Sequence, residues 1–315
     1  MPMIRRVAWP AERRSVVAMT SVAFYFVDVF ASQPLTGNPV SLVPDADGLV
    51  ESQMRAVARE FNQSETAFLL RPTMAGATMR LRSFTPIGAE VFGAGHHALG
   101  AWLWLAASDR LPGDGGGLAQ EIGGDVLPVE VIREAGEPVA ISMDQSPPEF
   151  GESVSDGAEL AAALGLAEDD LVPGEPAQVV STGAGHLLVP VRDRATVDRA
   201  APDAPRLAAV LRHVDGEGCY VYSPDPVDAA GAVAYTRFFN PTMGIWEDPA
   251  TGTAAGPLVA RLVAVGKVAD GATAVVEQGY ALGRPSRIQV TLSGPRVRVS
   301  GSGLVVAEGR MTVDE

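Results

Sequence analysis

Short stretches in which apolar and polar residues alternate recur along this chain of 315 residues and predict β-strands. They lie at residues 78–84, 126–132, 139–143, 232–239, 287–292 and 297–300. Helical patterns are fewer: residues 51–61 are apolar on one face only, whereas residues 98–107 and 254–265 are apolar on nearly every side. A helix that is apolar all round must be enclosed. We therefore predict an α+β fold in which each half of the chain curls a barrel-like sheet around one central helix.

The chain contains two similar copies of one motif, Arg-Ser-Phe-Thr-Pro at residues 82–86 and Arg-Phe-Phe-Asn-Pro at residues 237–241. Each copy continues through a glutamate, Glu90 or Glu247, into a loop of small residues and then into one of the two apolar helices. The offset of 237 − 82 = 155 residues is about half of the 315. This offset predicts two fused, pseudo-symmetric copies of one domain rather than a solenoid, whose repeats are about 20–50 residues long.

Each copy would offer a helix N-terminus to a cleft between the halves. The first turn of a helix leaves about four backbone N–H groups unpaired and carries roughly half a positive charge, so it can bind an anion. Small residues in both loops, Gly95 in the first copy and Ala250 and Gly252 in the second, would let a ligand reach the backbone. We expect the two helix ends to hold one small carboxylate.

Composition separates a short tail from a globular body. Residues 1–18 carry four arginines and one glutamate, a net charge of +3 against −14 for the whole chain, and predict a disordered tail with Met19 as an alternative start. The globular part divides into predicted domains at residues 19–135 and 136–315, with the alternative that the C-terminal strand returns to the first domain. The tail lacks the apolar core of a secretory signal.

Charge and cysteine content limit the partners and the compartment. A net charge of −14 weighs against nucleic acid or an anionic membrane as a partner, because the field repels phosphates. No apolar run reaches the ~18 residues that a membrane span needs. The single cysteine, Cys219, cannot form an intrachain disulfide, which favours a reducing cytoplasm.

Four polar residues are candidates for chemistry, and each has a simpler structural interpretation. Glu65 is either a solvated strand-start glutamate or a partly desolvated acid whose raised pKa lets it shuttle a proton. His96 either caps or packs the first central helix, or holds a polar group of the substrate beside the anion site. Asp248 either closes a turn or binds a substrate amine and steers a proton. Thr253 supplies a hydroxyl at the start of the second helix.

The remaining histidines suggest no metal site. His97 is expected to face the core or the domain boundary, and His186 and His213 are interpreted as structural residues because none has a partner at a metal-binding spacing. We therefore predict no metal and no other cofactor.

Several motifs together resemble the phenazine-biosynthesis PhzF-like isomerases. The similarity covers about residues 22–310. Its motifs lie at residues 26–30, 37–40, 62–68, 84–86, 95–96, 247–255, 278–279 and 283–286. The wider group includes diaminopimelate epimerase, and the resemblance implies two pseudo-symmetric domains, each a sheet curled around a central helix. It also implies a homodimer and catalysis without metal or pyridoxal phosphate.

The resemblance also assigns roles to residues. It implies that Glu65 shuttles the proton, that His96, Asp248 and Thr253 support it, and that Gly95 offers its backbone to the ligand. In the enzyme that gives the family its name, trans-2,3-dihydro-3-hydroxyanthranilate is isomerised by moving a hydrogen along a conjugated ring.

This chain departs from the family pattern at three places. Thr253 stands where serine is frequent, His97 stands where a small residue or proline is usual, and one extra residue separates Pro86 from Glu90. These departures bear on the identity of the substrate more than on the mechanism.

Epimerases and racemases of this fold use two opposed thiols, one at each helix start, and neither loop here contains a cysteine. We therefore predict a cofactor-independent isomerase that moves a proton within a small conjugated amino-carboxylate. Two alternatives stay open: an epimerase or lyase acting at an amino-acid α-carbon, and a non-catalytic binder of small carboxylates.

Overall fold

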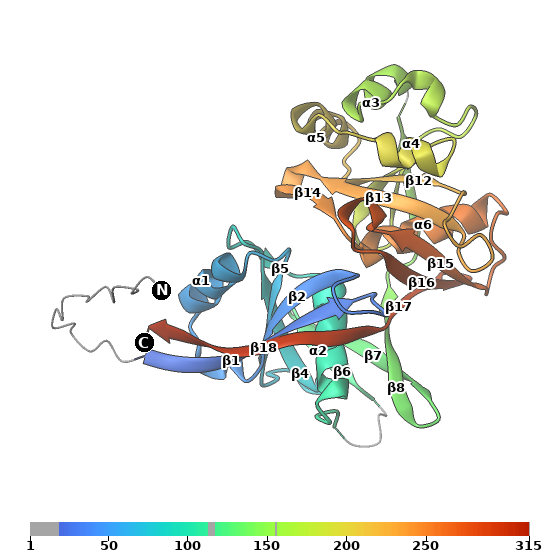
Figure 1. Ribbon diagram of the computed structural model, residues 1–315. Coiled ribbons are helices and arrows are strands. Elements are labelled where there is room, and N and C mark those ends of the chain that lie inside the picture. The colour runs from blue at the N-terminus through green and yellow to red at the C-terminus, as the bar shows by residue number, and fades with distance from the viewer. Residues whose placement is uncertain (1–18, 113–116, 155, 315) are drawn as a thin grey trace, which may run out of the picture.

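The computed structural model describes residues 19–112, 117–154 and 156–314, and these residues form two lobes (Figure 1). The tail predicted at residues 1–18 lies outside the described part of the chain. The first lobe contains β1 (Met19–Val29), β2 (Asn38–Val43), η1 (Ala46–Gly48), α1 (Glu51–Phe61), β3 (Thr66–Leu70), β4 (Met79–Phe84), β5 (Glu90–Val91), α2 (His96–Ala107), β6 (Ala119–Ile122), β7 (Asp125–Glu134) and β18 (Gly303–Asp314). Its sheet runs in the order β18-β1-β2-β3-β4-β6-β7, with β5 paired to β4.

The second lobe repeats this plan with additional helices. It contains β8 (Glu137–Gln145), β9 (Glu149–Ser153), α3 (Gly157–Ala163), η2 (Glu168–Asp170), β10 (Gln178–Ser181), β11 (Gly185–Pro190), α4 (Arg194–Arg199), α5 (Ala204–His213), β12 (Gly218–Ser223), β13 (Ala234–Asn240), η3 (Pro241–Met243), β14 (Ile245–Asp248), α6 (Gly252–Ala264), β15 (Thr273–Gln278), η4 (Tyr280–Leu282), β16 (Ser286–Ser293) and β17 (Arg296–Gly301). Its sheet runs in the order β8-β17-β16-β15-β13-β12-β11-β10-β9, with β14 paired to β13.

Strand directions repeat between the lobes. In the first, β2 is parallel to β3, β3 is antiparallel to β4, and β4 is parallel to β6. In the second, β11 is parallel to β12, β12 is antiparallel to β13, and β13 is parallel to β15. The central helices occupy equivalent places, since α2 follows β5 and α6 follows β14. The predicted fold, two pseudo-symmetric curled sheets that each surround one helix, is confirmed.

Both central helices are buried because they are apolar on nearly every side, as the sequence indicated. Trp102 and Leu99 of α2 and Leu258 and Val259 of α6 are 0–1% exposed. Each helix has a glycine at its fifth residue, Gly100 or Gly256. A Cβ atom on Gly100 would collide with the side chain of Val40, and one on Gly256 would collide with that of Gln145. The two glycines therefore allow each helix to approach its sheet closely.

In both lobes, the arginine of the duplicated motif forms an ion pair with the glutamate that follows the motif. Arg82 Nε lies 2.7 Å from Glu90 Oε1, and Arg237 Nε lies 2.8 Å from Glu247 Oε1. Each pair joins a long strand to the short strand that returns beside it, β4 to β5 and β13 to β14. The repeated arginine and glutamate thus fix the turn that leads into each central helix.

The additional helices cover the outer face of the second sheet (Figure 1). Strand residues alternate between two layers: Leu187 and Val189 of β11 pack with Leu160 of α3 and Leu207 of α5, whereas Leu188 packs inward with the core around α6. In the first lobe, α1 covers the outer face through Met54 and Val57, among others.

The lobes share their strands. β18 follows β17 of the second lobe directly but pairs antiparallel with β1 over residues 19–29, and β7 joins β6 of the first lobe to β8 of the second.

Of the helices in residues 19–112, 117–154 and 156–314, none combines the length and apolar character that a membrane crossing requires.

Candidate active site

A cleft of about 740 Å³ lies where the lobes meet. The first turns of both central helices line it, through residues 93–97 before and within α2 and residues 250–253 before and within α6. Every residue that the sequence singled out for the site contributes to its wall: Glu65, Gly95, His96, Asp248, Gly252 and Thr253. The fold thus brings these residues together, while their individual roles stay predictions.

Neither helix start has a side-chain cap within the described part of the chain. Gly95, at the cap position of α2, has no side chain to offer, and Thr251, at the cap position of α6, donates its hydroxyl to Asp248 Oδ2 at 2.5 Å instead. Because both first turns also line the cleft, their uncapped N–H groups are available to an anion bound there.

Glu65 immediately precedes β3, and its side chain is 14% exposed. Its Oε2 lies 3.2 Å from His96 Nδ1 and 4.0 Å from His97 Nδ1. This oxygen has no hydrogen-bond partner among the described residues. Burial raises the pKa of Glu65 above its usual value, because the charged form loses its hydration, and the nearby His97 opposes that rise.

His96 and His97 are the first two residues of α2, and their side chains are 8% and 2% exposed. Burial lowers the pKa of His96, although the nearby Asp248 opposes the shift, and burial lowers the pKa of His97 to about 4. Both imidazoles are therefore neutral near pH 7. His97, which the sequence placed in the core or at the domain boundary, lies in the cleft wall beside Glu65.

Asp248 is the last residue of β14. It belongs to the second lobe and therefore lies across the cleft from β3 of the first lobe. Its Oδ1 accepts a hydrogen bond of 2.9 Å from the side-chain amide of Asn38, the first residue of β2, so a first-lobe side chain holds a second-lobe acid. Burial raises the pKa of Asp248 from its ordinary 3.8 to about 6. The Asn38 amide also donates to the Ala250 carbonyl at 2.8 Å.

The fully buried Gln278, at the end of β15, fixes the loop between Asp248 and α6. Its amide nitrogen donates to the Asp248 carbonyl at 2.6 Å, and its amide oxygen accepts from the Thr251 N–H at 3.1 Å and from the Tyr220 hydroxyl at 2.9 Å. These three bonds hold the loop against β12 and β15.

His186, which the sequence analysis interpreted as structural, also lines the cleft. Its Nε2 lies 3.2 Å from Thr253 Oγ1, and its ring packs edge-on against Phe238 with the centroids 5.0 Å apart. Its Nδ1 has no hydrogen-bond partner within the described residues. The segment Gly183-Ala184-Gly185-His186 precedes an apolar strand, as Gly37-Asn38-Pro39-Val40 does in the first half, so the duplication was a signal that could have pointed to this residue.

The described residues that line the cleft include no lysine or arginine. Two of its acids are neutralised from outside, Glu90 by Arg82 and Asp144 by Arg296. The cleft therefore offers backbone N–H groups, amides and hydroxyls to an anion, and carboxyl groups to a cation.

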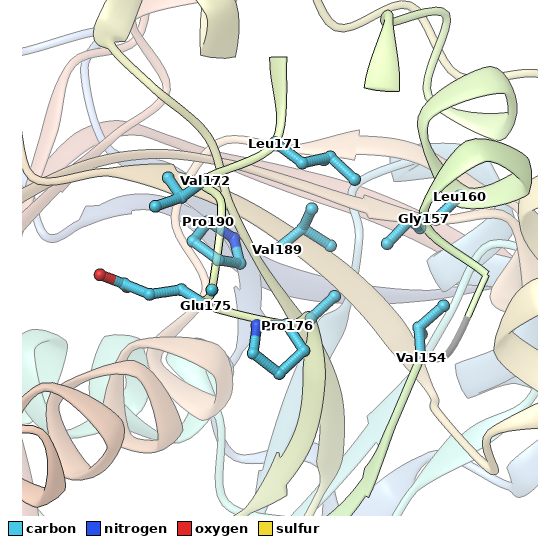
Figure 2. A pocket seen from close by; sticks show the side chains of 11 residues that line it. Val154, Gly157, Leu160, Leu171, Val172, Glu175, Pro176, Val189 and Pro190 are labelled. Atoms are coloured by element: carbon cyan, nitrogen blue, oxygen red, sulfur yellow. The ribbon is translucent and has the colours of Figure 1, made fainter. Parts of the chain in front are cut away.

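A second hollow, of about 230 Å³, lies beneath α3 in the second lobe (Figure 2). Apolar side chains such as Leu160, Leu171 and Val189 line it, and Glu175 is its one ionisable side chain among the described residues. It has no group that could take part in proton transfer with a neighbour, so the cleft between the lobes is the candidate active site.

Comparison with known proteins agrees with this geometry. A model of the family described as "Phenazine biosynthesis-like protein" matches residues 27–309. The chain is 36% identical to the trans-2,3-dihydro-3-hydroxyanthranilate isomerase of Pseudomonas aeruginosa, over 91% of this chain and 98% of the relative. A PhzF-family protein of Bacillus anthracis has a similar structure, with a TM-score of 0.85, 28% identity and coverage of 93% of this chain and 99% of that one. A hydroxyproline epimerase of Agrobacterium vitis, at 13% identity and a TM-score of 0.63 over 94% of this chain and 93% of that one, shares the fold.

Proposed function

This chain belongs to the phenazine biosynthesis-like (PhzC-PhzF) family, and we propose that it is an isomerase that moves a proton within a small conjugated amino-carboxylate. One observation carries the proposal. The carboxyl group of Glu65 is largely withdrawn from water, its Oε2 has no hydrogen-bond partner among the described residues, and this oxygen lies 3.2 Å from His96 Nδ1 at the start of α2.

Glu65 is the proposed acid and base. Its raised pKa suits a group that must both accept and return a proton near neutral pH. Glu65 takes a proton from a carbon atom that conjugation has made acidic. The electron pair of the broken C–H bond moves into the conjugated system, and Glu65, whose proton can exchange with water, delivers a proton to a different carbon as the double bond shifts.

The two helix starts are the proposed binding site for the substrate carboxylate. Since neither has a side-chain cap in the described chain, their N–H groups are already oriented for an anion. Such preorganised donors also stabilise negative charge that develops during proton removal, by about 3 kcal/mol per donor in comparable sites. The Thr253 hydroxyl, with its His186 contact, and the backbone at Gly95 and Gly252 complete this part of the proposal.

His96 and Asp248 are the proposed supporting groups. A neutral His96 can donate or accept a hydrogen bond beside the reacting carbon. Asp248 lies across the cleft, where its anion would pair with the substrate amine. Asn38 and Thr251 fix the orientation of the Asp248 carboxyl group, because Asn38 donates a hydrogen bond to its Oδ1 and Thr251 donates one to its Oδ2.

Turnover in deuterated water tests the proposal. With trans-2,3-dihydro-3-hydroxyanthranilate and related cyclic amino-carboxylates as substrates, we expect a shifted double bond and deuterium at the new C–H position. Deuterium at an inverted stereocentre, with the double bond unmoved, would instead identify an epimerase. Binding of these carboxylates without any hydrogen exchange would identify a non-catalytic binder.

The quaternary structure is a separate proposal. We propose a homodimer, on the basis of the family resemblance alone, and sedimentation equilibrium measures it directly. A mass of 32.8 kDa in solution would contradict it.

A further inference from the structure

We propose that Glu65, His96 and His97 form a binding site for a divalent first-row transition-metal ion, with Zn²⁺ as the reference ion. One ligand atom from each of the three side chains lies within 4.8 Å of the other two. The sequence shows no metal-type spacing here because Glu65 and the two histidines come from separate segments, which meet only when β3 and α2 pack together.

The separations fit a tetrahedral ion with little movement. Zinc binds nitrogen and oxygen ligands at about 2.0–2.2 Å, which puts neighbouring ligand atoms roughly 3.3 Å apart. His96 Nδ1 and Glu65 Oε2 are already 3.2 Å apart. His97 Nδ1 is 4.0 Å from the same oxygen, so it would have to move closer by roughly 0.7 Å.

Two of the three atoms that would bind the ion lack other partners. Glu65 Oε2 and His97 Nδ1 are buried without a hydrogen bond to any described residue. Buried polar atoms are normally paired, and each that is not costs free energy. A metal ion would satisfy the glutamate oxygen and one nitrogen of each imidazole at once.

The local backbone holds the two imidazoles at the cleft. His96 and His97 are consecutive residues in the first turn of α2, so their side chains diverge, with ring centroids 6.1 Å apart and an interplanar angle of 76°. Gly95 leaves room for the second ring, because a Cβ atom there would lie 3.3 Å from His97 Nδ1. All three ligand residues line the cleft, so water or a substrate oxygen can complete the coordination.

The donor set selects the class of metal. Two imidazole nitrogens and one carboxylate suit Zn²⁺, Ni²⁺, Cu²⁺ or Fe²⁺, whereas Mg²⁺ and Ca²⁺ prefer oxygen ligands alone.

Binding would compete with the proton at Glu65. The ion would occupy the oxygen that the isomerase needs, so Zn²⁺ would inhibit turnover reversibly and a chelator would restore it. This consequence rests on the proposed function, whereas the binding itself does not.

Isothermal titration of Zn²⁺ into the full chain, metal-free and without an affinity tag, tests the site independently of turnover. We expect one ion per chain. His97→Ala and Glu65→Gln should each weaken binding by at least about tenfold, since the loss of a ligand should cost no less than the loss of a group that hydrogen-bonds to a ligand. His213→Ala, at an exposed histidine of α5, is the matched control and should bind as the unmodified chain does. Mg²⁺ should give no binding heat.

Circular dichroism shows whether the variants are folded, and His97→Asn, a smaller change, replaces His97→Ala if that variant is not. Stoichiometric Zn²⁺ binding that survives in the folded His97 and Glu65 variants, or no binding to the unmodified chain, would overturn the site. A chain that binds Zn²⁺ but turns over no cyclic amino-carboxylate would contradict the isomerase proposal and leave the metal site supported.

Discussion

The side-chain amide of Asn38 donates a hydrogen bond of 2.9 Å to Asp248 Oδ1 across the boundary between the lobes. Both side chains are buried, with Asn38 fully so. The acid of one lobe is therefore oriented by a residue of the other, and the site depends on the two lobes being docked. Arg284 makes a comparable contact of 2.6 Å to Asp28, a nearly fully buried residue of β1.

Replacing Asn38 by leucine should destabilise the protein by about 1–3 kcal/mol, because Asp248 Oδ1 and the Ala250 carbonyl would lose their donor in a buried site. Urea unfolding measures the change. Gln289→Leu, at an exposed position of β16, is the control and should stay within about 0.5 kcal/mol. Equal unfolding midpoints for the two variants would show that the bond contributes nothing.

Glu65→Gln should lower kcat by about 10²–10⁴-fold while the fold and the affinity for a carboxylate ligand are kept, because glutamine has the same shape but cannot exchange the proton. Steady-state kinetics and ligand titration measure the two effects. Glu60→Gln, on the exposed face of α1, is the matched control. Turnover unchanged by Glu65→Gln would exclude Glu65 as the base.

The value of kcat/KM should rise as the pH rises through about 6, because Asp248 loses its proton there and its anion then pairs with the substrate amine. Below that pH the carboxyl group is neutral and the pairing is lost. Asp248→Asn should lower kcat/KM and remove the inflection. An inflection near pH 6 that persists in this variant would assign it to another group.

The stability contributed by a neutral, buried His186 should fall as the pH falls from 6.5 toward 4. Burial lowers the pKa of the folded His186 to about 4, while the unfolded chain takes up the proton near 6.5. In that window the unfolded state binds more protons, so acid favours unfolding by up to about 1.4 kcal/mol per pH unit. The difference in unfolding free energy between the unmodified chain and His186→Asn should narrow accordingly, with His213→Asn measured in parallel. A constant difference would contradict the shifted pKa.

Gly100→Ala should lower the free energy of unfolding by on the order of 1 kcal/mol. Overpacking against Val40 costs about 1–3 kcal/mol, which exceeds the gain of up to ~1 kcal/mol from the helix propensity of alanine. Gly48→Ala, where a Cβ atom meets nothing within 4 Å, is the control for thermal unfolding. A higher melting temperature for Gly100→Ala would show that α2 can move away from its sheet.

The sequence predicted the fold in detail because its signals are local. The apolar helices appear as α2 and α6, and the expected 51–61 helix has those bounds in the structure. The cleft residues Glu65, His96 and Asp248 were candidates from their positions in the sequence, and the family resemblance assigned their roles. The position of His97 beside Glu65 was missed, because it depends on how β3 packs against α2.

The contact between His186 and Thr253 was also missed. The alternation of residues along a strand predicts which face of the sheet a side chain lies on. It does not predict which helix N-terminus that side chain contacts. The duplication held the relevant signal, since Asn38 and His186 occupy echoing motifs and both contact the segment at the start of α6, through Ala250 and Thr253.

The return of β18 to the first lobe has a consequence for synthesis on the ribosome. The central helix α2 packs against β1, β2 and β18, and β18 consists of residues 303–314. The nascent chain therefore emerges with α2 incompletely covered until residues 303–314 have left the exit tunnel. N-terminal domains usually finish folding first, but here the earliest lobe to be made is completed last.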